Sequence, residues 1–134
     1  MTGFPLKIVT PDGISFDGTA EQLVVRTTSG DAAIMARHVN YVAPLGMGQA
    51  VVTVDGEKRY AACIGGMVSV VDGVVTLVPT TFEWSKDIDV ARAEASQRRA
   101  QDTLDKSDAT DLELRLASAR MKRALIRTNV AKYK

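Results

Sequence analysis

Residues 67–80 read Met-Val-Ser-Val-Val-Asp-Gly-Val-Val-Thr-Leu-Val-Pro-Thr, and this stretch decides the fold of the chain. Two β-rich runs flank an Asp-Gly pair, which is a strong signal for a β-hairpin because glycine tolerates a positive φ angle. The stretch also contains Pro79, and all 10 glycines and all 4 prolines lie at or before this residue. The residues before it therefore have the composition of strands and turns, and those after it have the composition of helices.

The same hairpin pattern recurs closer to the start of the chain. A second Asp-Gly pair, Asp55-Gly56, joins the β-rich runs 50–54 and 58–64. Further β-rich runs end at turn-forming residues, at 6–10, 14–16 and 22–28. Tandem hairpins whose short strands recur roughly every 8–12 residues are typical of an antiparallel β-sandwich or barrel.

The rest of the chain has the pattern of two helices. Strong helix formers begin at Asp87, and a polar segment at 105–108 suits a turn. A second helical run extends from Asp111 to Val130. Three residues are candidates for the N-cap of this second helix: Ser107, Asp108 and Asp111.

These patterns predict a protein of the β + α class. We expect an N-terminal antiparallel β-sandwich over residues 1–84 and a C-terminal antiparallel two-helix hairpin over residues 85–134. The last acidic residue is Glu113, and only basic charges follow it, whereas residues 80–113 are net acidic. Opposite charges on consecutive helices favour antiparallel pairing, modestly and in a salt-dependent way.

Composition and charge argue against several classes of protein. A hydrophobic content of 46% and a charged content of 25% are ordinary for a soluble globular chain. The formal net charge of +1 gives no overall bias towards nucleic acid or an anionic membrane. No apolar run approaches the roughly 18–20 residues that cross a bilayer, and no signal peptide is evident at residues 1–7. We therefore expect a cytoplasmic protein, for which docking on a membrane complex stays open.

No catalytic or metal-binding constellation stands out, so we expect a protein that is not an enzyme. The one histidine, His38, has no cluster of further histidines or cysteines with which to hold a metal. The one cysteine, Cys63, stands among apolar residues and reads as a buried small side chain rather than a nucleophile. The segment 46–48 lacks the spacing and the lysine of a phosphate-binding glycine-rich loop.

The less polar stripes of the predicted helices are rich in alanine. On the first helix they are Ile88, Ala91 and Ala95, and beside them Val90, Ala93, Gln97, Ala100 and Leu104; on the second they are Leu114, Ala117, Met121, Ala124, Leu125 and Thr128. Each methylene that an alanine lacks relative to leucine forgoes roughly 0.8 kcal/mol of burial. Two readings stay open. Either the hairpin adheres weakly enough for a ligand or partner to move it, or alanine fits a tight and permanent interface.

Arginines recur at helical spacing on both predicted helices. Arg92 and Arg99 are seven residues apart on the first, whereas Arg120, Arg123 and Arg127 share a stripe on the second. These side chains either form solvated charged faces or hold an anionic ligand such as a phosphate, or an acidic protein surface. A further expected surface pair joins two residues three apart, Asp89 and Arg92.

Four segments together resemble the epsilon subunit of bacterial F-type ATP synthases. Residues 82–95 resemble the start of that family's C-terminal domain, and 88–93 resemble its ATP-binding motif. Residues 7–13 match the opening strand and turn, 30–38 the loop that precedes the family's histidine, and 119–124 the second helix. No single motif suffices, but their combination covers essentially the whole chain in the right order.

The resemblance implies a β-sandwich of about ten strands followed by two helices. It implies a non-catalytic central-stalk subunit whose sandwich binds the gamma subunit and the c-ring, and that reaches the cytoplasmic face of the bacterial plasma membrane only through this complex. The tail either folds on the sandwich or extends into the alpha/beta catalytic hexamer, where it blocks ATP hydrolysis. In several members, ATP binds the folded hairpin and favours it. No catalytic cofactor, metal or nucleic acid is implied.

The resemblance also implies roles for individual residues. The set similar to the family's ATP site is Glu83, Ile88, Asp89, Arg92, Ala93, Arg99, Arg123 and Arg127. We expect the four arginines of this set to meet phosphate charge, and Asp89 to orient the site or to contact adenosine. The residues similar to partner contacts are Asp31 for the c-ring, His38 for gamma, and Arg115, Arg120, Lys122 and Arg123 for the acidic surface of the beta subunits.

The chain departs from the family in one loop. The family commonly reads Leu-Pro-Gly-His-x-Pro where this chain reads Met35-Ala36-Arg37-His38-Val39-Asn40. Both prolines are absent, which predicts a less rigid loop, and Arg37 adds a charge where glycine is common.

Three hypotheses follow for the function. The chain is a regulatory rotor subunit whose tail senses ATP, or the same subunit with a tail that inhibits without physiological sensing of ATP. The third, from another class, is an autonomous β-sandwich ligand-binding module with an oligomerising helical tail.

Overall fold

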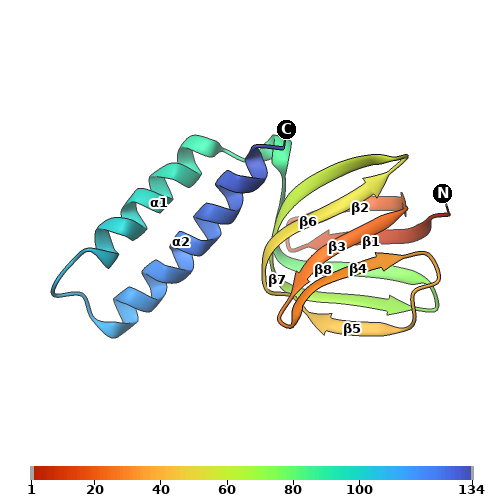
Figure 1. Ribbon diagram of the computed structural model, residues 1–134, viewed down its shortest axis with the longest axis horizontal. Coiled ribbons are helices and arrows are strands. Elements are labelled where there is room, and N and C mark those ends of the chain that lie inside the picture. Colours follow the sequence, from red (N-terminus) through yellow and green to blue (C-terminus); the bar gives the residue numbers. More distant parts are fainter. Residues whose placement is uncertain (1, 134) are drawn as a thin grey trace. The chain divides into compact units, whose positions relative to one another are not determined.

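The computed structural model describes residues 2–133. The chain divides into two compact units, and the division falls between Trp84 and Ser85. Figure 1 shows that the first unit is built of strands and the second of helices. The fold class is therefore β + α, as predicted from the change of composition after Pro79.

Within the described residues, the first unit contains eight strands. They are β1 (Phe4–Thr10), β2 (Gly13–Ala20), β3 (Gln22–Thr27), β4 (Gly30–Met35), β5 (Tyr41–Pro44), β6 (Met47–Val54), β7 (Glu57–Val71) and β8 (Val74–Trp84). They pair in the order β2-β1-β8-β7-β6-β3-β4, and β5 also pairs with β7. The pairing of β1 with β8 is parallel, whereas the other pairings between these strands are antiparallel.

The two longest strands, β7 and β8, pass through both layers of the sandwich. Residues 57–64 of β7 pair with β6, whereas residues 67–70 pair with β5. Between these parts, Gly65 and Gly66 adopt φ angles of 69° and 96°, which only glycine reaches easily, and the strand changes layer there. The structure thus has eight strands rather than about ten, and β7 passes through the two β-rich runs 58–64 and 67–71 as one strand.

The Asp-Gly hairpins form as predicted. In the turn after β6, Asp55 and Gly56 have φ angles of 52° and 76°, and in the turn after β7, Asp72 and Gly73 have φ angles of 49° and 81°. Positive φ at both central residues is the backbone of the two-residue type I′ turn, which matches the twist of paired strands.

Large aliphatic side chains fill the interior of the sandwich. The bulkiest are no more than 1% exposed: Leu6, Ile8, Leu23, Ile34 and Leu77. Cys63 lies in the same core, and burial raises the pKa of its thiol to about 12. A protonated thiol is a poor nucleophile, so the structure agrees with the prediction that Cys63 is a small apolar core residue.

The second unit begins with the short 3₁₀ helix η1 (Ser85–Asp87) and continues into α1 (Val90–Leu104). Helical residues were expected from Asp87, but α1 begins three residues later. The carboxylate of Asp89 accepts a hydrogen bond of 3.0 Å from the backbone N–H of Arg92 and so caps the helix.

Helix α2 (Asp111–Ala131) matches its predicted extent, but its cap differs from all three candidates. Thr110 is the N-cap: its hydroxyl accepts from the N–H of Glu113 at 3.1 Å, and the Glu113 carboxylate accepts from the N–H of Thr110 at 3.3 Å. This reciprocal pair is a capping box, and the pattern Thr-x-x-Glu at 110–113 was the signal for it.

Helices α1 and α2 run antiparallel and pack against each other (Figure 1). Their buried residues are nearly all alanine, namely Ala93, Ala100, Ala117, Ala124, Val130 and Ala131. We call this set the alanine seam. The seam is rich in alanine, as predicted, but Ala91 of the other predicted stripe is exposed.

Candidate functional site

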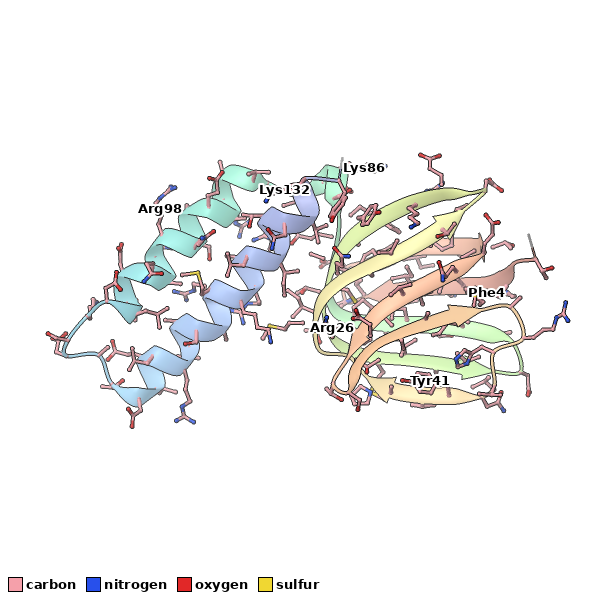
Figure 2. The ribbon with its side chains drawn as sticks, viewed as in Figure 1. Phe4, Arg26, Tyr41, Lys86, Arg98 and Lys132 are labelled. Atoms are coloured by element: carbon pink, nitrogen blue, oxygen red, sulfur yellow. The ribbon has the colours of Figure 1, made fainter. Side chains whose placement is uncertain are left out.

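Exposed arginines border the alanine seam on the first helix. Arg92 and Arg99 each directly precede a buried seam residue, Ala93 and Ala100 respectively. Because consecutive residues are about 100° apart around an α-helix, both arginines project from the same edge of the seam. Arg98 is exposed and projects outward from α1 (Figure 2). It lies about 100° around the helix from Arg99 and therefore on another face.

A matching set of arginines lies on the second helix. Arg120 and Arg123 are exposed and Arg127 is half-buried, and Arg123 directly precedes the buried Ala124. In an antiparallel pair, equivalent positions on the two helices lie on the same side of the plane through their axes. The arginines that precede seam residues on both helices therefore border one side of the hairpin, as the sequence spacing suggested.

Asp89, a member of the predicted ATP set, also caps the N-terminus of α1. The carboxylate of Asp89 bonds to the backbone of Arg92 and not to its guanidinium, so the predicted side-chain pair is replaced by a helix cap. Ile88, only 4% exposed, and the fully buried Ala93 lie on either side of this cap. The cap fixes where α1 begins and hence the direction of Arg92 from the helix.

The predicted ATP residues are divided between the two units. Seven of the eight lie in the hairpin, and Glu83 lies in β8, where it is half-buried and pairs across the ladder with Ala62. The hairpin thus brings together the arginines and the start of α1, and Glu83 belongs to the sandwich.

The remaining basic residues of the second helix face solvent. Arg115, Arg120 and Lys122 are exposed, and no acidic residue follows Glu113. This half of α2 is therefore a positively charged surface of the hairpin.

In the sandwich, Asp31 is already paired. It lies in β4 directly opposite Arg26 of β3, and Asp31 Oδ1 accepts a hydrogen bond of 2.6 Å from Arg26 Nε. The side chains are 51% exposed for Arg26 and 57% exposed for Asp31. This hydrogen bond, more than the attraction of the opposite charges, raises the pKa of Arg26.

The loop between β4 and β5 holds the other predicted partner contact. The half-buried ring of His38 stacks edge-to-face on Tyr41, with ring centres 5.6 Å apart, and its Nδ1 lies 2.7 Å from the Val39 carbonyl oxygen. The preceding residue, Arg37, has a φ angle of 65°, which is unfavourable for a side chain other than glycine. This loop is held locally in a strained backbone conformation.

One surface was not predicted from the sequence, an apolar face on the outside of β5, β7 and β8. Its members are between 43% and 62% exposed: Val42, Met67, Val71, Val74 and Val78. Met67 pairs across the ladder with Val78, Val71 pairs with Val74, and Val42 pairs with Ser69 between them. We call these five residues the valine face. Their alternation with buried neighbours in residues 67–78 was the signal that could have found them.

Metal-binding clusters and membrane-spanning helices are both absent from the described part of the chain. Residues 2–133 contain no group of three or more histidine, cysteine, aspartate or glutamate side chains placed to hold a metal ion. Among the helices of the same residues, none is long and apolar enough to span a membrane.

Comparison with known families finds two matches that together cover nearly the whole chain. Residues 3–85 match the β-sandwich domain of the ATP synthase delta/epsilon chain, and residues 86–132 match its long α-helix domain. A curated relative, the ATP synthase epsilon chain of Ruminococcus albus, is 42% identical over 135 residues, and the alignment covers 100% of both chains.

Two solved structures have a similar fold at low sequence identity. A chain in the Euglena gracilis mitochondrial ATP synthase, from an assembly of OSCP, F1 and c-ring, has a TM-score of 0.83 and 18% identity. It is matched over 100% of the present chain and 83% of its own. A chain in the central stalk and c-ring of the Tetrahymena thermophila mitochondrial ATP synthase has a TM-score of 0.61 and 16% identity, with 95% of each chain covered.

Proposed function

The chain belongs to the ATP synthase delta/epsilon chain family, and we propose that it is the non-catalytic epsilon subunit of the central stalk in a bacterial F-type enzyme. In this role it links the gamma subunit to the c-ring and turns with the rotor. The full-length similarity to an epsilon chain is the observation that carries the proposal. The subunit then lies at the cytoplasmic face of the plasma membrane, which it meets only through the complex.

The valine face is the surface that we assign to gamma. Five large apolar side chains gathered on one sheet, each more than two-fifths exposed, are unfavourable in water unless another surface covers them. The uncharged residues Ser69 and Thr76 lie between them in the register of β7 and β8. A dry contact of this kind suits a partner that stays bound while the rotor turns.

The hairpin is the part that we expect to move. Burial of alanine contributes little adhesion, so a modest difference in binding free energy is sufficient to shift the seam between packed and open states. In the open state, α2 carries Arg115, Arg120, Lys122 and Arg123 to an acidic surface of the beta subunits and blocks ATP hydrolysis. The absence of acidic residues after Glu113 supports this partner.

ATP is the ligand that we assign to the packed state. The guanidinium groups of Arg92, Arg99, Arg123 and Arg127 suit the charge and the fork geometry of phosphate oxygens. They come from both helices, so a phosphate chain bound between them opposes opening of the seam. Asp89 contributes through its cap on α1, which orients Arg92.

Calorimetric titration of ATP into the isolated chain tests this site. We expect dissociation constants in the millimolar range or tighter. Arg92→Ala should weaken binding at least about tenfold, since a charge-assisted hydrogen bond contributes about 1.5–3 kcal/mol. The matched control is Arg98→Ala, which removes another exposed arginine from a different face of the same helix. Equal affinity of the two variants would refute the phosphate assignment.

Removal of the residues after Lys86 tests the inhibitory role of the tail. The truncated subunit, assembled into the parent complex, should give a higher rate of ATP hydrolysis than the full chain. A rise in hydrolysis without ATP binding by the full chain would favour a tail that inhibits without sensing ATP. An unchanged rate would refute the inhibitory role.

Copurification tests the identity of the partners. An affinity-tagged chain should retain gamma and the c-ring, and replacement of Val71 and Val74 of the valine face by serine should release gamma. If the wild-type chain purifies alone, the autonomous ligand-binding module is the better description.

A further inference from the structure

The alanine seam is not uniform along the hairpin. Its one larger side chain, Val130, is 1% exposed and lies near the end of α2, where α2 contacts η1. Ile88, which directly follows η1, is also buried. The larger apolar side chains that the second unit buries therefore lie at the end of the hairpin where α1 begins and α2 terminates. Figure 2 marks this end by Lys86 of η1 and Lys132, the C-cap of α2.

A side-chain hydrogen bond joins η1 to the same end of α2. The hydroxyl of Ser85, which is 7% exposed, donates to the backbone carbonyl oxygen of Tyr133 at 3.4 Å. The last carbonyl groups of a helix lack partners within it, and the carbonyl just past α2 receives this donor from η1. The bond is longer than the usual range of roughly 2.5–3.0 Å for a hydroxyl donor. It is therefore weak, and the burial of Val130 contributes more of the adhesion.

The residue before Ser85 is held in the sandwich. Trp84 Nε1 donates to the Ser15 carbonyl oxygen at 3.3 Å, and the indole ring contacts the rings of Phe16 and Phe82 edge-to-face. Because Ser85 is bonded directly to this anchored residue, η1 cannot follow α2 when α2 moves away. The contact between η1 and α2 has to break first.

The connection between the helices determines where the hairpin opens. The loop between Leu104 and Asp111 joins α1 and α2 covalently at their far end. A hairpin that the chain closes at one end separates first at the other, so opening begins where α2 meets η1. The alanine contacts further along the seam are weaker and open once this end is free.

We propose that η1 and the C-terminal end of α2 form a clasp, made by the Ser85 hydroxyl, the Tyr133 carbonyl and the Val130 side chain, whose release precedes opening of the hairpin. The clasp, and not any single alanine contact, then sets how often the hairpin opens. As a control on release of an inhibitory tail, this inference rests on the proposed function.

Amide hydrogen exchange of the isolated full chain tests the clasp. A helix released from its partner is only marginally stable in water, so the exchange rates of α2 report how often the hairpin opens. Ser85→Ala removes the hydroxyl donor and should raise these rates about threefold. Val130→Ala removes two buried carbon atoms and should raise them about tenfold. Both increases should reach Ala117, far from the substituted residues, because opening at the clasp frees the whole helix.

Two exposed positions on α2 supply matched controls. Ser118→Ala removes a hydroxyl and Leu125→Ala shortens an aliphatic side chain, both away from the clasp, and both should exchange as the wild type does. The inference is overturned if the clasp variants exchange no faster than these controls. It is also overturned if their exchange rises only after Asn129, because the end of α2 would then fray without opening the hairpin.

ATP hydrolysis by the parent complex separates the clasp from the proposed function. The double variant Ser85→Ala and Val130→Ala releases the tail more often, so the complex should hydrolyse ATP about twofold more slowly or less. Faster exchange with unchanged hydrolysis would uphold the clasp and refute the inhibitory role of the tail. Unchanged exchange would overturn the clasp and leave the inhibitory role to the truncation after Lys86.

Discussion

The two units of this chain bury different kinds of side chain. Most residues of the sandwich core are leucine, isoleucine or valine, whereas the hairpin seam is made of alanine with a single valine. A leucine buries three more carbon atoms than an alanine, at about 0.8 kcal/mol for each. For the same number of buried positions, the seam therefore contributes much less free energy than the core.

The units also differ in where their hydrogen bonds come from. The sandwich depends on ladders between distant segments, such as β1 with β8, and on a change of layer at Gly65 and Gly66. Each helix of the hairpin is stabilised within itself, by the caps at Asp89 and Thr110. Opening the seam leaves both helices with their own bonds, whereas opening the sandwich breaks its ladders. The hairpin can thus change state at lower cost than the sandwich.

The largest expected effect on stability is at Gly66, where β7 changes layer. A Cβ atom on Gly66 would clash with the carbonyl oxygen of Val78 and would lie 2.7 Å from Pro79 Cα, at a φ angle of 96°. Because backbone atoms cannot yield, we expect Gly66→Ala to lower the free energy of unfolding by about 4 kcal/mol or more. Urea unfolding, followed by the fluorescence of Trp84, the one tryptophan, measures this change.

The control for this substitution is Gly73→Ala. Gly73 also has a positive φ angle, 81°, but a Cβ atom there meets nothing within 4 Å. We expect a loss of about 1–2 kcal/mol, the cost of the left-handed backbone alone. If both variants lose the same stability, the change of layer does not depend on the close approach of the β8 backbone to Gly66. The sandwich would then differ less from the hairpin in how tightly it is packed.

The next prediction concerns how tightly the seam is packed. Ala100 is fully buried in the seam, whereas Ala91 is exposed on the same helix. Ala100→Leu should lower the free energy of opening the hairpin by about 1–3 kcal/mol, because a close-packed contact cannot accept the added carbons without strain. Amide hydrogen exchange in α1 and α2 measures opening, and Ala91→Leu should leave it nearly unchanged. Stronger protection in Ala100→Leu would mean that the seam has unfilled space.

Much of this comparison could be predicted from the sequence, since its signals are local. The Asp-Gly pairs identify their turns because the φ angles they favour are set within two residues. The alanine stripes predict the seam because helical periodicity depends only on spacing along the chain. The extent of the second helix follows from the same periodicity, whereas its cap, Thr110, differs from the serine and aspartate candidates.

The rest depends on contacts between distant segments. Gly65 and Gly66 read as a break between strands, and only the pairing of β8 along both parts of β7 makes the strand continuous. The valine face requires the register of three strands, and the pair of Arg26 with Asp31 requires the register of two. Asp89 was placed in the site by resemblance, but its bond to the Arg92 backbone depends on where the helix begins.

A smaller effect is expected at the cap of α1. Asp89→Ala removes the acceptor for the Arg92 N–H and should destabilise the hairpin by about 1 kcal/mol, whereas Asp89→Asn retains a capping oxygen and should cost only a few tenths. Hydrogen exchange of the first turn of α1 measures the difference, and the unfolding of the sandwich should not change. Equal losses in the two variants would mean that the negative charge, rather than the cap, stabilises the start of the helix.

The smallest effect tests whether strain is confined to the sandwich. Among the described residues, those other than glycine with positive φ angles are Arg37, Asp55 and Asp72, all in the first unit. The two aspartates lie in type I′ turns, in which a positive φ angle is favourable, whereas Arg37 does not lie in such a turn and arginine rarely adopts this backbone. Arg37→Gly should raise the free energy of unfolding by about 0.5–1 kcal/mol, since relief of the left-handed backbone exceeds the entropy lost by glycine.

Arg37→Ala removes the same charge but keeps the strain, and it should bring no gain. A gain in both variants would trace the effect to the charge of Arg37. A gain in Arg37→Gly alone would establish that the sandwich carries backbone strain in the loop between β4 and β5. The low adhesion of the hairpin would then come from its small side chains and not from a distorted backbone.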